Sequence, residues 1–196
     1  MLDHITIRVS DRAASERFYD TVLRTIGIER SGRDDDYTVW RGQFSLAQAD
    51  ADHPVTRRLQ IGFASAGQAQ SWIDPDGNSV EAVQRDDARG RVFDHLLIRV
   101  VDLAAAKRFY DTVAPFGGFS AGSEEFELVA GEPTENLHLA FEAISNETVD
   151  AFHRALIDAG YRDNGAPGPR HYHAGYYGAF VLDPDGNNVE VVNHNR

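Results

Sequence analysis

The stretch Phe180-Val-Leu-Asp-Pro-Asp-Gly-Asn-Asn-Val-Glu-Val-Val192 has a near copy earlier in the chain, Trp72-Ile-Asp-Pro-Asp-Gly-Asn-Ser-Val-Glu-Ala-Val83. In each copy the proline presets one backbone angle of the turn and Asp-Gly supplies a positive φ, so a tight reversal between two strands is predicted. Alternation along the second strand places Asn188, Glu190 and Val192 on one face. Glu190 therefore lies mid-strand among apolar residues, where an unpaired carboxylate is costly, and a partner for it is expected.

The chain is acidic and contains no cysteine. Its 196 residues carry a formal net charge of -12, which argues against nucleic acid and against an anionic membrane surface, because both would be repelled. A small molecule is the expected partner. Without cysteine there is no disulfide framework and no thiolate nucleophile, so any metal must be held by nitrogen and oxygen ligands.

The length allows one large domain or two small ones, each with a proper core. No apolar run is long enough to span a bilayer. The first residues, Met1-Leu-Asp-His4, lack the basic start and the hydrophobic core of a signal peptide. A cytoplasmic protein is therefore expected.

The chain contains an internal repeat. Leu2–Val22 matches Phe93–Val113 at an offset of 91 residues, and 14 of these 21 positions are identical. This level of identity predicts two homologous halves, residues 1–86 and residues 91–196. The boundary between them falls in the polar stretch Arg85–Gly90.

Each half opens with a strand and an amphipathic helix. The alternation in His4-Ile-Thr-Ile-Arg-Val9 puts the apolar residues on one face and His4 on the other, and His95 follows the same parity in the second half. Asp11 and Asp102 are expected to cap the helices that follow. The histidines are thus predicted to point away from the core.

The two halves have lost different segments. They realign where Leu59–Phe63 matches Leu137–Phe141, at an offset of 78 instead of 91, so the second half is 13 residues shorter before this point. At the Asp-Pro-Asp-Gly turn the offset is 109, so the first half is 31 residues shorter between Phe63 and this turn. The chain therefore contains four modules, at about 1–52, 55–86, 92–133 and 135–194, of which the outer two are complete and the inner two truncated.

Further elements are predicted from local patterns. A helix is expected at Glu147–Ala159 and a Gly/Pro loop at Asn164–Pro169. Short strands are expected at Thr38–Trp40, Phe44–Ala47 and Glu125–Val129.

Three motifs occur in a fixed order. Asp-His on a strand precedes Phe-Tyr-Asp on a helix, then comes Leu137-His-Leu-Ala-Phe141, and then Tyr172-His-Ala-Gly-Tyr-Tyr-Gly-Ala-Phe-Val-Leu-Asp-Pro-Asp-Gly-Asn-Asn-Val-Glu190. Their combination, which spans nearly the whole chain, resembles the vicinal oxygen chelate superfamily of glyoxalase I, fosfomycin-resistance transferases, bleomycin-resistance proteins and extradiol dioxygenases. The resemblance implies an α+β fold of tandem βαβββ modules whose curved mixed sheets form a cup around a divalent metal ion such as Fe, Mn, Ni or Zn.

The resemblance also implies a ligand set of two histidines and one glutamate. Carried over to this chain, His138 and Glu190 come from one module, and the first-strand histidine of its partner module is His4 or His95. If the second half closes on itself, His95 completes the site, and Glu127 is placed to act as a fourth ligand or catalytic base. If the outer modules pair, His4 completes the site and Ser45 stands where a glutamate would be.

The repeat also implies an equivalent site in the other pair of modules, called the twin site below. This twin site is expected to be defective, because Gln60 stands at the position of His138 and a neutral amide is a poor substitute for imidazole. Glu81 is then structural. The segment Arg170–Tyr177 suggests substrate-binding roles for Arg170, Tyr172 and His173 at the mouth of the cup, or else a loop that covers the sheet edge. The remaining histidines outside the pattern, expected at the surface, are His53, His153 and His194.

Three functions follow from these patterns. The first is a metal-dependent lyase or dioxygenase that holds adjacent oxygens of a small molecule on the metal. The second is a metal-free binder similar to the bleomycin-resistance proteins. The third is a pseudoenzyme that serves assembly, and the chain is expected to be a monomer or a homodimer.

Overall fold

The computed structural model describes residues 2–88 and 90–196; Arg89 of the predicted boundary stretch lies outside the described residues. In chain order the elements are β1 (Leu2–Val9), α1 (Arg12–Thr25), β2 (Arg30–Arg33), β3 (Tyr37–Trp40), β4 (Phe44–Gln48), β5 (Gln60–Ser65), β6 (Gln70–Ile73), β7 (Ser79–Gln84), β8 (Phe93–Val100), α2 (Leu103–Gly117), β9 (Phe126–Ala130), β10 (His138–Glu142), α3 (Asn146–Asp158), β11 (Arg162–Pro169), β12 (Tyr177–Leu182) and β13 (Asn188–Asn193).

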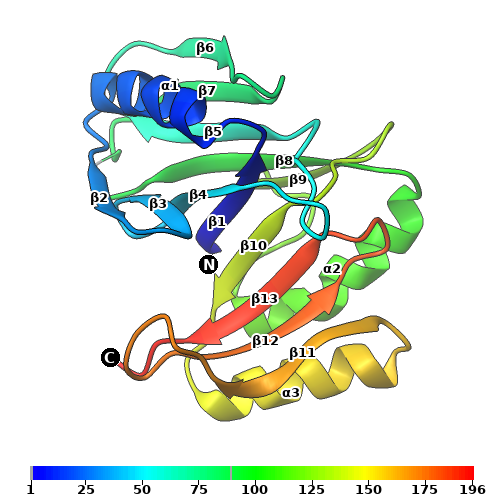
Figure 1. The fold of residues 1–196 in the computed structure, drawn as a ribbon. Coiled ribbons are helices and arrows are strands. Elements are labelled where there is room, and N and C mark those ends of the chain that lie inside the picture. Colours follow the sequence, from blue (N-terminus) through cyan, green and yellow to red (C-terminus); the bar gives the residue numbers. More distant parts are fainter. Residues whose placement is uncertain (1, 89) are drawn as a thin grey trace.

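The strands form two mixed sheets (Figure 1). The eight-stranded sheet has the order β11-β12-β13-β10-β1-β4-β3-β2, and the five-stranded sheet has the order β6-β7-β5-β8-β9. Each sheet combines strands from residues 1–86 with strands from residues 91–196. The predicted α+β fold of curved mixed sheets is confirmed.

The pairing of the first strands joins the two halves. β1 runs antiparallel to β10, and β5 runs antiparallel to β8. The complete outer modules therefore share one sheet and the truncated inner modules share the other. The alternative in which the second half closes on itself is not the arrangement of the chain.

The two sheets pack their apolar faces against each other. Phe44 contacts Phe63 across the sheets with ring centroids 5.3 Å apart, and Phe126 contacts Phe141 at 5.8 Å. One continuous cluster of buried residues includes side chains from both sheets and from all three helices of the described residues. The polar faces, which carry the histidines, are therefore turned away from this core, as the alternation predicted.

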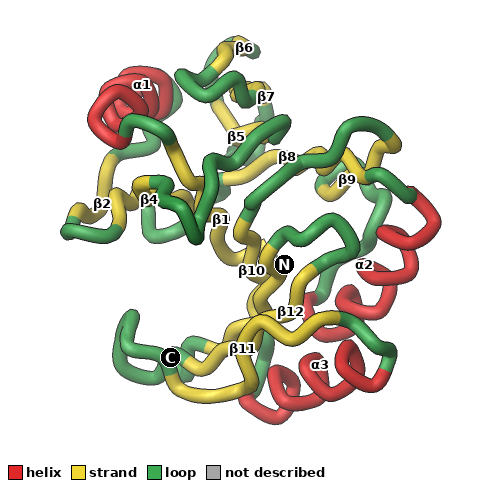
Figure 2. Tube along the Cα trace, turned by 45° about the vertical axis from the view of Figure 1, so that its right-hand side comes forward, coloured by secondary structure: helices red, strands yellow, loops and turns green. Residues whose placement is uncertain are grey.

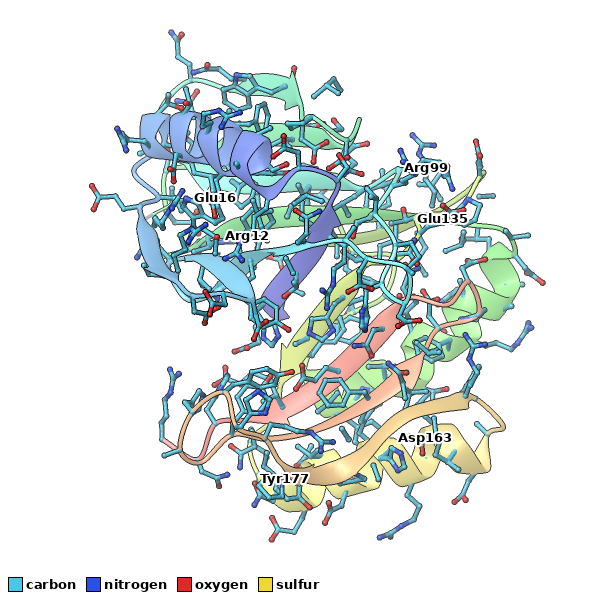
Figure 3. All side chains as sticks on the ribbon, viewed as in Figure 1. Arg12, Glu16, Arg99, Glu135, Asp163 and Tyr177 are labelled. Carbon is cyan, nitrogen blue, oxygen red and sulfur yellow. The ribbon has the colours of Figure 1, made fainter. Side chains whose placement is uncertain are left out.

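The helices lie at the periphery of the sheets (Figure 2). On α3, the side chain of Asp150 accepts a hydrogen bond from the Tyr177 hydroxyl at 2.8 Å, and His153 Nε2 is 2.9 Å from Asp163 Oδ1. Figure 3 shows Asp163 and Tyr177 beside α3. None of the helices in the described part of the chain has the length and apolar character that crossing a membrane requires.

The Asp-Pro-Asp-Gly turn is a buried structural clamp. One oxygen of Asp183 accepts from the backbone N–H groups of Asp185 (2.9 Å) and Asn187 (2.8 Å), and the other accepts from the Asn187 amide (3.0 Å) and the Tyr110 hydroxyl (2.9 Å). Tyr110 lies on α2, so the clamp fixes this helix to the turn before β13. The first half repeats the arrangement with Tyr19 and Asp74 at the same 2.9 Å.

Two strands were not predicted. β2 carries Arg30-Ser-Gly-Arg33, which has no apolar alternation to reveal it. β11 includes the stretch Asn164–Pro169, which was predicted to be a loop. It pairs with β12 as an edge strand with irregularities between Asp163 and Gly165 and between Gly165 and Gly168. Prolines and glycines are tolerated there because an edge strand leaves part of its backbone unpaired.

We expect that Tyr110→Phe lowers the free energy of unfolding by about 1–3 kcal/mol, because it removes a donor from a buried carboxylate. Tyr19→Phe should cost a similar amount, since its hydroxyl makes the equivalent bond to Asp74. Urea denaturation of both variants checks this. A loss below about 0.5 kcal/mol in both would show that the two clamps do not stabilise the fold.

Candidate metal centre

Three side chains converge on the polar face of the eight-stranded sheet. His4 Nε2 lies 3.1 Å from His138 Nε2, and Glu190 Oε2 lies 3.2 Å from His138 Nε2 and 3.5 Å from His4 Nε2. One ligand atom from each residue lies within 4.8 Å of the others, and no other such group of three or more occurs in residues 2–88 and 90–196. The trio is therefore the candidate site of the described chain.

Strand register brings the trio together. Ala140 on β10 lies between its neighbours His4 on β1 and Glu190 on β13. His138 is two residues before Ala140, so its side chain is on the same face of the sheet. The three side chains come from three adjacent strands of the two complete modules.

The carboxylate of Glu190 is almost completely buried, with 1% of the residue exposed. Its second oxygen, Oε1, accepts a hydrogen bond from the Tyr176 hydroxyl at 2.7 Å. A side chain at Gly178 would overlap Oε1, so the glycine leaves room for the carboxylate. The partner predicted from the sequence is therefore a group of three residues, Tyr176 and the two histidines, of which Tyr176 had not been assigned a role.

In each histidine Nε2 faces the other members of the trio, and the outer nitrogen, Nδ1, faces away from them. The two Nδ1 atoms have different partners. His4 Nδ1 is 2.7 Å from Asp3 Oδ2, whereas His138 Nδ1 is 2.9 Å from the side-chain amide nitrogen of Asn188. A carboxylate can only accept a hydrogen bond, while an amide can either accept or donate. These contacts fix the orientation of both rings.

The two imidazoles also differ in pKa. Burial opposes the charged form of His4, but the hydrogen bond to Asp3 and the charge of Glu190 outweigh it, so the pKa of His4 is raised. Burial is the dominant influence on His138 and lowers its pKa despite the neighbouring Glu190. The two shifts therefore run in opposite directions, because Asp3 and Glu190 outweigh burial at His4 whereas burial prevails at His138.

The trio lies at the wall of a cavity of about 770 Å³. Thr6, Arg8 and Ser45 also line the cavity, and Thr6 and Ser45 are paired neighbours on β1 and β4. Ser45, which was expected to stand where a glutamate would be if the outer modules pair, thus lines the same cavity as the trio. Such a concave site with a few convergent polar groups is typical of small-molecule binding.

Two of the three predicted substrate-binding residues line this cavity, Tyr172 and His173. Arg170 does not line it. Its guanidinium carbon lies 5.1 Å from the centre of the Phe180 ring, and its Nη2 donates to the carbonyls of Ala166 (2.6 Å) and Gly178 (3.2 Å). The expectation for Arg170 is therefore corrected: its cation is engaged by the backbone and by an aromatic face, which sequence spacing does not reveal.

His194 has an unexpected place in the site. Its Nε2 lies 2.9 Å from Asp3 Oδ1, and its Nδ1 lies 2.9 Å from His173 Nε2. Burial opposes the charged form of Asp3, but the hydrogen bonds from His4 and His194 prevail and lower its pKa. His53, also expected only at the surface, lies at the rim of the same cavity. No sequence motif marks either residue, because both lie outside the strands, His194 directly after β13 and His53 in the loop after β4.

The twin site lies in the five-stranded sheet. Gln60 Nε2 donates to Glu81 Oε1 at 2.9 Å, and His95 Nε2 is 3.8 Å from Glu81 Oε2. Of the two alternatives left open by the sequence, the one in which His95 joins His138 is not adopted, because β8 pairs with β5 and β9 and not with β10. Glu127, the predicted base of that arrangement, lies opposite Leu97 in the same five-stranded sheet and away from the trio.

The donor set of the trio fits a divalent metal ion. Two imidazole nitrogens and one carboxylate oxygen converge, and each outer atom is held by a hydrogen bond from the surrounding structure. Two histidines and one carboxylate leave open positions on a metal and suit Fe(II), Mn(II) and similar ions. Hydrogen bonds to the outer atoms of ligands are the usual support of such sites.

Comparisons with known proteins agree with the fold of this chain. Residues 114–191 match the family model described as the Glyoxalase/Bleomycin resistance protein/Dioxygenase superfamily. Glyoxalase I from Zea mays is similar in structure over 98% of this chain and 92% of that chain, with 18% identity and a TM-score of 0.63. A mutant of the same maize enzyme gives 16% identity and a TM-score of 0.68, covering 98% of this chain and 93% of that chain. No curated protein sequence matches the chain.

We expect that Tyr176→Phe destabilises the protein by about 1–3 kcal/mol, because it leaves the buried Oε1 of Glu190 without its donor. The control is Tyr172→Phe, at a residue that is 50% exposed, which should change stability by about 0.5 kcal/mol or less. Urea denaturation in the presence of a chelator measures both. Equal, small effects would show that Tyr176 does not support the carboxylate.

Proposed function

Since the chain has the fold of the vicinal oxygen chelate superfamily, we propose that it is a metal-dependent enzyme of the glyoxalase or dioxygenase kind. Its substrate is a small, oxygen-rich molecule that binds in the cavity beside the trio. The observation that carries the proposal is the convergence of His4, His138 and Glu190, whose ligand atoms lie within 4.8 Å of one another. At this level of identity the similarity to glyoxalase I supports the fold, and the reaction is our inference from the site.

His4, His138 and Glu190 would hold the divalent ion. When bound, such an ion acts as a Lewis acid that polarises adjacent substrate oxygens. Tyr176 keeps Oε1 of Glu190 engaged, so that Oε2 is the oxygen turned to the two histidines. Asp3 holds the proton of His4 on Nδ1, which leaves the lone pair of Nε2 directed at the centre of the trio.

Arg8 is the residue most suited to select an anionic substrate. It lies on β1 four residues after His4, on the same face, and lines the cavity. Its backbone N–H donates to Thr56 and its guanidinium to the Gln48 carbonyl, and none of the ion pairs in the described part of the chain involves Arg8. A cationic group without a carboxylate partner favours a substrate that carries its own negative charge.

A second candidate function is binding of an aromatic ligand without metal, as in the bleomycin-resistance proteins. The observation in its favour is the set of aromatic rings along the cavity: Tyr37, Tyr172, Tyr176 and Phe180. Tyr172 and Tyr176 meet edge to face at 5.0 Å. Such rings can stack on a planar ligand without any metal. This candidate requires that the purified protein binds its ligand equally well after treatment with a chelator.

We expect that His138→Ala abolishes stoichiometric binding of a divalent metal, because it removes one of three ligands. The matched control is Gln60→Ala at the twin position, which should leave binding intact since an amide contributes little to a transition-metal site. Elemental analysis of protein purified without chelator or affinity tag decides it. Equal metal content in the parent and His138→Ala would contradict the proposal.

A second pair of variants tests which first-strand histidine completes the site. His4→Ala should weaken metal retention by orders of magnitude, whereas His95→Ala should leave it unchanged and alter stability by about 1 kcal/mol or less. Competition with a chromophoric chelator and thermal melts provide the two readouts. A larger loss for His95→Ala would place the site in the five-stranded sheet and refute the assignment to His4.

A further inference from the structure

His4 and His138 face the same centre, but only His4 is held by a group with a fixed hydrogen-bonding role. The carboxylate of Asp3 can only accept, so the proton of His4 must lie on Nδ1, toward Asp3. His4 Nε2 then offers its lone pair to the centre of the trio. A metal ligand needs this tautomer.

At His138 the roles are reversed, because the group beside its Nδ1 is an amide nitrogen, which donates a hydrogen bond. Asn164 Nδ2 donates to Asn188 Oδ1 at 3.0 Å, so that the amide nitrogen of Asn188 faces His138 Nδ1 at 2.9 Å. In this arrangement Asn188 donates and His138 Nδ1 accepts. The proton of His138 then lies on Nε2, between Glu190 Oε2 at 3.2 Å and His4 Nε2 at 3.1 Å, and it fills the place where a metal would need a lone pair.

The tautomer that binds a metal requires the Asn188 amide to turn. With Nε2 on a metal, the proton of His138 lies on Nδ1, and Asn188 must present Oδ1 to accept it. A half-turn of the Asn188 amide achieves this without moving the backbone. Asn188 Nδ2 then faces Asn164, which must present its own oxygen.

The position of Asn164 follows from an irregularity in the edge strand. β11 pairs with β12 at Asp163 and at Gly165, and the register shifts between them, so Asn164 has no paired neighbour on β12. Bulges of this kind commonly redirect a side chain near a functional site. Here the redirected amide reaches Asn188 and sets its orientation.

We propose that Asn188 is the positioning residue of His138 and that Asn164 controls its orientation, so that metal binding is coupled to a turn of the two amides. This inference rests on the proposed function, because it assumes that the trio binds a divalent metal. It predicts that an acceptor in place of the Asn188 amide favours the metal-binding tautomer. It also predicts that an apolar residue there removes the support of the His138 ring.

The first test measures zinc affinity of the full chain by competition with a chromophoric chelator. Asn188→Leu should bind zinc about 10–100-fold more weakly than the parent, the usual loss when a ligand's supporting hydrogen bond is removed. Asn188→Asp, which can only accept, should bind at least as tightly as the parent. The matched control is Asn193→Leu on the same strand, whose amide contacts Asn146 and Asn195 instead of the trio and whose affinity should be parental.

The second test uses Asn164→Asp, for which a purely structural role predicts the opposite result. The new carboxylate can only accept, so it draws Asn188 Nδ2 toward itself and turns Oδ1 to His138. Zinc binding should therefore tighten. A structural role alone would weaken it or leave it unchanged.

The third readout is the tautomer itself, observed by two-bond proton–nitrogen NMR of protein with ¹⁵N-labelled histidine, with His138 assigned by comparison with His138→Ala. In chelator, the parent should carry the His138 proton on Nε2, and Asn188→Asp should carry it on Nδ1. Zinc should move it to Nδ1 in the parent. These shifts report on the hydrogen bond independently of any activity.

Parental zinc affinity in Asn188→Leu, weaker or unchanged binding in Asn164→Asp, or a proton on Nδ1 in the zinc-free parent would each overturn the inference while leaving the metal site in place. A parent protein that binds no zinc, manganese or iron at all would instead refute the proposed function, and the coupling with it.

Discussion

The carboxylate of Glu190 imposes the main constraint on the eight-stranded sheet. It is 1% exposed, in the middle of a strand whose neighbouring residues are apolar. A lone buried carboxylate costs several kcal/mol, so its surroundings must supply donors or positive charge. Tyr176, His4 and His138 do so, and each comes from a different segment of the chain. The same contacts that stabilise the buried carboxylate therefore also hold these segments of the chain together.

That constraint explains why the two halves must join. His4 is at the start of the chain and Glu190 near its end, and they meet only because β1 pairs with β10. The complete modules share one sheet within a single chain, so no exchange of modules between chains is needed to assemble the trio. The truncated modules share the other sheet, where Gln60 already satisfies Glu81 through a hydrogen bond. The loss of segments and the loss of the second histidine thus fall on the same sheet.

Support for the site is divided between rigid and adjustable groups. The Asp183 and Asp74 clamps fix the turns before β13 and β7 through buried hydrogen bonds that involve only backbone, amide and phenol donors. Around the trio, Asp3 can only accept, whereas the Asn188 amide can exchange its two roles by rotating. Side-chain amides such as Asn188 and Asn164 can exchange donor and acceptor by rotating, so the network can adapt to either tautomer of a neighbouring ring without moving the backbone.

Local sequence by itself determined most of the elements and the internal repeat. The Asp-Pro-Asp-Gly turns and the alternation of β1 and β13 predicted strands and their faces, because turn chemistry and strand periodicity depend on neighbouring residues. The internal repeat aligned Gln60 with His138, and the resemblance to the vicinal oxygen chelate superfamily implied the α+β fold and the candidate roles of His138 and Glu190. The tertiary structure alone decided that His4 and not His95 joins His138, since the pairing of first strands depends on contacts between distant segments. It also decided that Arg170 turns to Phe180, and that Asn164–Pro169 is an edge strand. Each of these depends on how separate strands pair or on how a side chain packs against a neighbouring strand, which no local pattern encodes.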